Sequence, residues 1–83
     1  MNDKGRDFPQ YRKLFNEKAF YKIIDDRHFE EIQLMGSRKM TYAFTAEKYP
    51  EILRIQDMLN LEAGYRECAP EEYEILLRPL QNW

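Results

Sequence analysis

The strongest constraint on the fold of this chain is that one small hydrophobic core must hold it together. Its 83 residues are too few for two domains, and a single cysteine cannot form an intramolecular disulfide. One histidine and one cysteine also fall short of the ligands that a structural zinc site needs. The stability therefore has to come from the hydrophobic residues, which make up 43% of the chain. We expect a single compact domain over residues 1–83, with residues 1–6 disordered.

The reactive side chains argue against an enzyme. The candidate nucleophiles are Ser37, Thr41, Thr45 and Cys68, and His28 is the one imidazole that could act as their base. The three glycines, Gly5, Gly36 and Gly64, are too dispersed to form a phosphate-binding loop. The sequence therefore predicts a non-enzymatic protein without a cofactor or a resident metal.

Cysteine content and hydropathy also bear on where the protein works. A lone cysteine is typical of a reducing compartment, and the charged start of the chain lacks the apolar segment of a secretory signal. No apolar run approaches the roughly 20 residues that span a bilayer. We expect a cytoplasmic protein with no membrane partner.

Charge is distributed unevenly along the chain, although the net charge is only −2. Residues 1–24 carry six basic and three acidic side chains, whereas residues 61–83 carry two basic and five acidic ones. A basic first third and an acidic last third can attract each other within the molecule or attract a charged partner.

Residues 7–24 predict a helix followed by a strand. Asp7 with Gln10 has capping-box spacing, Pro9 falls in the first turn, and the apolar residues up to Phe15 share one helical face. These features predict a helix over residues 8–18. Residues 20–24 are rich in aromatic and β-branched side chains and predict a strand.

The middle of the chain predicts a β-hairpin. Met40, Tyr42 and Phe44 alternate with smaller residues, as in a strand with one face in the core, and residues 36–39 have the length of a hairpin loop. Residues 29–35 fit a strand or a helix by spacing alone, and the hairpin interpretation favours a strand. We also expect most of the aromatic side chains to lie in the core.

A helical repeat returns after residue 46. Tyr49, Ile52, Ile55 and Leu59 form an apolar stripe that predicts a helix over residues 47–60. Residues 69–72 have the composition of a helix start, but residues 73–77 fit a helix or a strand. The predicted fold is a small α+β domain in which a three-stranded antiparallel β-meander packs against helices on one face, in the order αβββαα.

Two clusters have a chemical interpretation beside a structural one. Residues 25–31 hold His28 and four carboxylates that suit a hard cation or acid–base chemistry, which would make a metal-assisted enzyme, yet neighbouring strand residues point to opposite faces. We favour a solvated charged turn. Cys68 precedes an acidic helix start, where Glu67, Glu71 and Glu72 disfavour a thiolate, so we expect a structural thiol.

Basic residues next to aromatic ones suggest nucleic acid as an alternative partner. In such a small RNA- or DNA-binding module, Arg12, Lys13, Arg38 and Lys39 would contact phosphates while aromatic rings stacked on bases. The pI of about 5.4 is low for that class.

The favoured interpretation is a small intracellular protein-interaction or regulatory domain that binds another protein or itself. Its candidate surface combines the basic and acidic segments with the C-terminal tryptophan, which is either buried or an exposed anchor. The residues are Arg12, Lys13, Arg38, Lys39, Glu71, Glu72 and Trp83.

Overall fold

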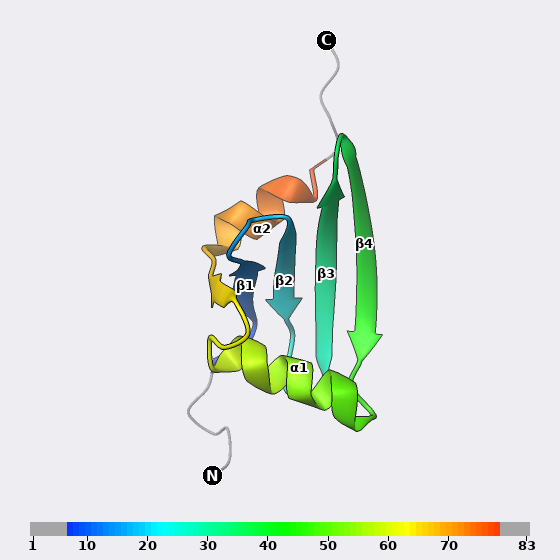
Figure 1. Cartoon of the computed structure of the whole chain (residues 1–83), viewed down its shortest axis with the longest axis vertical. Helices are drawn as coiled ribbons and strands as arrows, with labels where there is room; N and C mark the ends of the chain where they lie inside the picture. The colour runs from blue at the N-terminus through cyan, green and yellow to red at the C-terminus, as the bar shows by residue number, and fades with distance from the viewer. Residues whose placement is uncertain (1–6, 79–83) are drawn as a thin grey trace.

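The computed structural model describes residues 7–78, in which five strands and two helices form a small α+β domain. The elements are β1 (Gln10–Leu14), β2 (Ala19–Ile23), β3 (His28–Met35), β4 (Arg38–Thr45), α1 (Tyr49–Leu59), β5 (Tyr65–Glu67) and α2 (Pro70–Leu76). All strand pairs are antiparallel, and the order across the sheet is β4-β3-β2-β1-β5 (Figure 1). Residues 1–6, predicted to be disordered, and Trp83 lie outside the described residues.

Several predicted elements are confirmed. Residues 29–35 are a strand, β3, and they pair with β4 around a tight turn at Gly36 and Ser37, where Gly36 has a φ of 63°. The helix predicted over residues 47–60 is α1, and β2 matches the strand predicted over residues 20–24 to within one residue. Residues 73–76 are helical, which resolves the choice left open for the end of the chain.

The helix predicted over residues 8–18 is wrong, because residues 10–14 form β1. Tyr11 packs on one side of the sheet with Phe20 and Tyr73, whereas Arg12 reaches the other side and bonds to the backbone of α1. A strand that is covered on both faces loses the polar–apolar alternation that identifies strands. The three-residue β5 was not predicted, so the sheet has five strands instead of three.

The two helices cover opposite faces of the sheet, not one face as predicted. Residues of α1 join a cluster that contains Tyr21, Ile23 and Phe29, while Tyr73 of α2 joins a second cluster with Phe20 and Ile32. Because successive strand residues point to opposite faces, Phe20 and Tyr21 belong to different cores. Figure 1 shows α1 crossing the sheet near the end of β4 and α2 lying beside β1 and β2.

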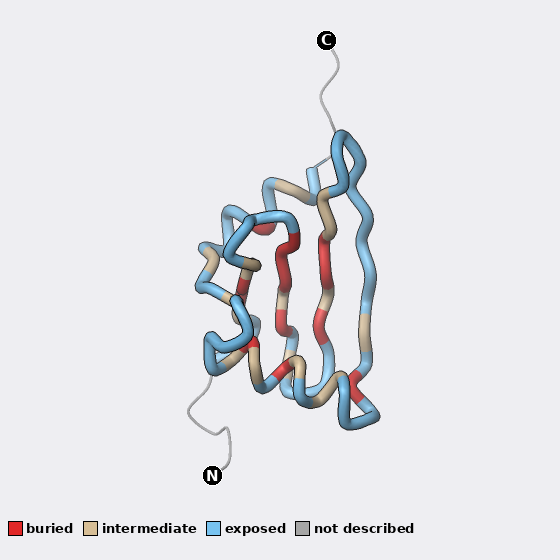
Figure 2. The backbone as a smooth tube through the Cα atoms, in the orientation of Figure 1, coloured by how far each residue is buried: buried red, intermediate tan, exposed pale blue. Residues whose placement is uncertain are grey.

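The position of β4 corrects a further prediction. Met40 and Tyr42 were expected in the core, but each is 38% exposed, and Phe44 is half-buried. The helices cover the central strands and leave most of β4 at the surface, as Figure 2 shows. Tyr49, placed on the apolar stripe of α1 by its spacing, is likewise exposed.

Candidate functional site

The candidate site is the outer edge of β4, which is exposed in the described part of the chain. This strand is eight residues long and lies at one end of the sheet, so that only β3 pairs with it. Seven of its eight residues are exposed. The strand contains no proline, and residues 40–46 carry no charge. Proteins normally protect edge strands with proline or with charged side chains, because an open edge binds other strands.

The hydrogen-bond pattern shows which backbone groups face outward. The Leu34 N–H donates to the Lys18 carbonyl at 2.9 Å, so the even-numbered residues of β3 bond toward β2 and the odd-numbered ones toward β4. Odd residues of β3 pair with even residues of β4, such as Gln33 with Met40. The N–H and C=O groups of the odd-numbered residues therefore face away from the sheet, at Lys39, Thr41, Ala43 and Thr45.

These outward groups are available for a partner. Within residues 7–78, no hydrogen bond reaches the backbone of Lys39, Thr41 or Ala43 from outside β3, while the Thr45 carbonyl accepts a bond from the Glu47 N–H. Lys39, Thr41 and Ala43 thus present a row of backbone donors and acceptors, two residues apart, which is the spacing at which an added antiparallel strand forms its hydrogen bonds.

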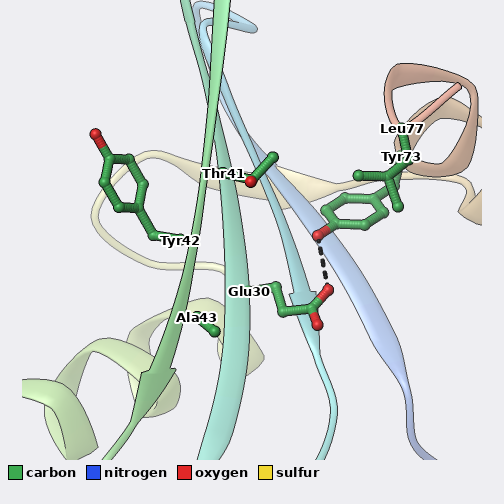
Figure 3. Close-up of a pocket in the computed structure, with 6 residues that line it drawn as sticks. All are labelled: Glu30, Thr41, Tyr42, Ala43, Tyr73 and Leu77. Carbon is green, nitrogen blue, oxygen red and sulfur yellow. Dashed lines mark hydrogen bonds between the residues drawn. The ribbon is translucent and has the colours of Figure 1, made fainter. Parts of the chain in front are cut away.

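The side chains of β4 form a different row on each face of the sheet. Met40, Tyr42 and Phe44 lie on the face that α1 covers, where the Phe44 ring stacks on Phe29 with centroids 4.8 Å apart. The Tyr42 ring follows, 6.3 Å from Phe44. Thr41 and Ala43 lie on the opposite face, and Figure 3 shows both side chains on the other side of β4 from the Tyr42 ring.

A cavity of about 410 Å³ adjoins the aromatic row. Tyr42 and Phe44 form one wall, and Arg54 of α1 and the buried Glu31 form another. The Arg54 guanidinium lies 5.3 Å from the Phe44 ring centroid and 3.5 Å from a Glu31 carboxylate oxygen. Tyr21 also donates its hydroxyl hydrogen to Glu31 at 2.8 Å, so the buried carboxylate has two partners. The cavity can accept a side chain that has aromatic or apolar character.

A second cavity, of about 310 Å³, lies on the other face between β4 and α2. Thr41, Glu30, Tyr73 and Leu77 line it, and the Tyr73 hydroxyl donates to Glu30 at 3.2 Å (Figure 3). Burial, then the nearby Glu30 charge, raises the pKa of Tyr73 above its ordinary value. Both cavities border β4, so a strand added at this edge would have space for side chains on each face.

The structure separates the predicted surface cations. Arg12 is 8% exposed, and its Nε donates to the Met58 carbonyl at 2.8 Å, so it does not lie on the surface. Lys13 lies on the opposite face, 3.0 Å from Glu72 of α2 and 3.0 Å from Glu17. The basic and acidic thirds therefore do meet within the molecule, through Lys13 and Glu72.

The remaining predicted site residues lie elsewhere. Arg38 and Lys39 begin β4 and are exposed, although the Lys39 ammonium donates to the Leu76 carbonyl of α2. Glu71 is exposed in the first turn of α2. Arg38 and Lys39 are thus separated from Arg12 and Lys13 by the width of β2 and β3.

The acidic cluster at residues 25–31 does not converge. Asp25 accepts bonds from the Arg27 N–H and pairs with the His28 Nδ1 at 2.8 Å, while Glu30 and Glu31 point to opposite faces toward Tyr73 and Tyr21. Nowhere in residues 7–78 are three His, Cys, Asp or Glu side chains grouped so that they could hold a metal ion. The bonds from Arg27 and His28 lower the pKa of Asp25.

Cys68 is half-buried beside Glu72. Burial and then the Glu72 charge raise the pKa of its thiol to about 11. A thiol with a raised pKa is mostly protonated near neutral pH, which agrees with a structural role.

Comparison with protein-family models, with curated proteins and with solved structures finds no match for this chain. Among the described helices, none has the length and apolar character needed to cross a membrane. The candidate site therefore has to be judged on its own geometry. Reasoning from sequence missed it because it took the alternation of residues 40–44 as the mark of a buried strand. The absence of charge across residues 40–46 was the available signal.

Proposed function

We propose that this protein is a protein-interaction domain whose binding surface is the outer edge of β4, where an extended segment of a partner adds a strand to the sheet. The supporting observation is the eight-residue exposed edge whose outward backbone groups at Lys39, Thr41 and Ala43 have no partner among the described residues. The proposal retains the predicted class, a non-enzymatic interaction domain, and moves its surface from the charged segments to β4.

Strand addition explains how one edge supplies both affinity and selectivity. Main-chain hydrogen bonds to the outward groups give affinity for any extended segment, and side-chain pockets on alternate faces select its sequence. The exposed Met40 and Tyr42 and the two bordering cavities are suited to that selection. Tyrosine and methionine are also among the residues enriched at protein interfaces.

The other edge of the sheet has the usual protection, which makes the open edge at β4 distinctive. β5 has three residues, and two of them, Arg66 and Glu67, are charged and exposed. Short strands and charged residues prevent unwanted pairing at an edge. The contrast supports a binding role for β4, because the same chain protects one edge and leaves the longer one open.

The nucleic-acid alternative draws less support. It needs a shared basic surface, but Arg12 is buried, Lys13 is paired with two carboxylates, and Arg38 and Lys39 lie beyond two intervening strands. Phosphate contacts require accessible cations on one face. The predicted cytoplasmic location is part of the proposal.

The test blocks the outward edge with Thr41→Pro and uses Thr41→Val as its matched control. Proline removes the outward N–H, which β3 does not use, whereas valine keeps the backbone donor and a β-branched shape. Immobilised wild type and both variants are exposed to nuclease-treated extract of the source cells. We expect wild type and Thr41→Val to retain the same proteins and Thr41→Pro to lose them. Far-ultraviolet circular dichroism checks that Thr41→Pro is folded.

Two outcomes would count against the proposal. If Thr41→Pro retains the same proteins as wild type, the β4 edge is not the binding surface. If binding is present only before nuclease treatment, the nucleic-acid alternative is correct.

A further inference from the structure

We infer that the strand that pairs with β4 is β4 of a second copy of this chain, so that the protein forms a symmetric dimer through one continuous sheet. This inference rests on the proposed function and names its partner. A two-fold axis at an edge strand makes the two copies antiparallel and brings each outward donor opposite an outward acceptor. In such a dimer, the strand that pairs with β4 comes from the same sequence, so that no other protein is required.

Charge complementarity along β4 favours a second copy. The hairpin end of the strand carries Arg38 and Lys39. The opposite end leads to the exposed Glu47 and, since His28 pairs with Thr45, lies beside the acidic turn that precedes β3. Carboxylates outnumber cations at that end, where Asp25, Asp26, Glu47 and Glu51 accompany Arg27 and Lys48. Antiparallel pairing brings each basic end beside the acidic end of the other copy.

The register follows from the outward residues and the charges. Only odd-numbered residues face outward, so Thr41 of one copy must pair with an odd residue of the other. Pairing Thr41 with Ala43 centres the axis on Tyr42, overlaps residues 39–45 fully, and brings Arg38 within one residue of Glu47 of the second copy. Centring on Thr41 instead would move Arg38 away from that carboxylate, and centring on Ala43 would place Lys39 opposite Glu47 but shorten the paired segment of β4 to residues 41–45.

This register also pairs the aromatic row with itself. Tyr42 lies opposite Tyr42 of the second copy, and Met40 lies opposite Phe44, all on the face that α1 covers. Aromatic cross-strand pairs and sulfur–aromatic contacts both stabilise strand association. The exposed fraction of Met40 and of Tyr42, 38% in each case, would fall on pairing.

Such an assembly stops at two copies. The two-fold axis uses both β4 edges, and the joined sheet then ends at β5 on each side. β5 is short and charged, so it resists further pairing. A closed dimer is therefore expected instead of a filament.

Sedimentation equilibrium of the purified protein tests the dimer from about 10 µM to about 1 mM, the range in which modest interfaces dissociate. We expect wild type and Thr41→Val to show a monomer–dimer equilibrium and Thr41→Pro to weaken it by at least about tenfold. Tyr42→Lys serves as a second variant with an intact backbone, because it places two like charges opposite each other. Ile75→Lys, an exposed change on α2, is its control and should leave the dimer unchanged.

Cysteine cross-linking tests the register in a Cys68→Ser background. Directly opposite residues that do not exchange hydrogen bonds have Cα atoms about 4.5 Å apart, a separation that a disulfide can bridge. We expect Tyr42→Cys to cross-link with itself on mild oxidation. Met40→Cys and Phe44→Cys should cross-link only when the two variants are mixed. Self-cross-linking of Met40→Cys without that of Tyr42→Cys would overturn the register.

The outcomes separate this inference from the proposed function. If wild type remains monomeric at about 1 mM while Thr41→Pro still loses captured proteins, the partner is not a second copy and the β4 surface stands. If Thr41→Pro and Tyr42→Lys both dimerise as wild type does, β4 is not the dimer contact, and the self-pairing inference is wrong. If Thr41→Pro also retains captured proteins, the proposed function fails as well.

Discussion

At the scale of single residues, Arg12 shows how a charge that looks like a surface feature can be structural. Helix α1 has no basic residue in its last turn, and Arg12 of β1 supplies one by donating to the Met58 carbonyl at 2.8 Å. Helix C-termini carry unsatisfied carbonyls and a partial negative charge, which a guanidinium stabilises. The position of Arg12 in the sequence gave no sign of this, because the partner lies 46 residues away.

Replacing Arg12 should therefore destabilise the fold. We expect Arg12→Met, which keeps an unbranched stem, to lower the free energy of unfolding by about 1.5–3 kcal/mol, the usual worth of a hydrogen bond to a charged group. Urea denaturation measures the change. Arg38→Met, at an exposed position, is the control and should stay within about 0.5 kcal/mol of wild type. Equal effects of the two substitutions would remove the structural role of Arg12.

At the scale of elements, the predictions succeeded for α1 and for the strands β2 and β3, and they failed for β1 and for the burial of β4. Helix α1 and the β3–β4 hairpin have regular patterns with clear turn residues, and both are confirmed. β1 is covered on both faces, and its side chains have no strand alternation. β4 alternates clearly yet lies at an edge of the sheet. Its exposure was not predicted, because no local pattern encodes which strand becomes the outermost one.

Helix α2 places one buried side chain in the core. Tyr73 is its one buried residue, 1% exposed, and its ring lies 5.5 Å from that of Tyr11. We expect Tyr73→Ala to lower the free energy of unfolding by about 3–5 kcal/mol, as for other large aromatic deletions in a core. Urea denaturation followed by circular dichroism tests this. Leu77→Ala, at a 47% exposed position, is the matched control, and a loss as large as that of Tyr73→Ala would contradict the assignment.

At the scale of the whole molecule, buried tyrosines make the fold sensitive to alkali. Burial is the first cause that raises the pKa values of Tyr21 and Tyr73 above 10.0 and that of Cys68 from 9.0 to about 11. A raised pKa in the folded state means that these groups stay protonated to a higher pH in the folded protein than in the unfolded chain. The stabilisation is complete below the unfolded pKa values and is lost as the pH rises through the folded ones.

The free energy of unfolding should therefore fall as the pH rises above about 9. Urea denaturation at a series of pH values from neutral to alkaline measures the fall. Tyr73→Phe removes one of the groups and should reduce the slope, even if it shifts the overall stability. A slope that is unchanged in Tyr73→Phe would show that this buried hydroxyl does not contribute.

The candidate site follows from the whole molecule rather than from any segment. The sequence contains the uncharged run at residues 40–46, but its meaning depends on strand order and on which backbone groups face outward. Those properties arise from pairings between distant strands, such as β1 with β5. The predicted cations Arg12 and Lys13 do not share a face for the same reason, since neighbouring strand residues alternate onto opposite faces of the sheet.

Amide hydrogen exchange along β4 tests the central claim most directly. The amides of Tyr42 and Phe44 bond to β3 and should be protected at every protein concentration, whereas those of Thr41 and Ala43 face outward. We expect the Thr41 and Ala43 amides to exchange rapidly near 10 µM and to become at least about tenfold slower near 1 mM, as the edges pair. Rapid exchange of both amides throughout this range would contradict pairing of the two β4 edges.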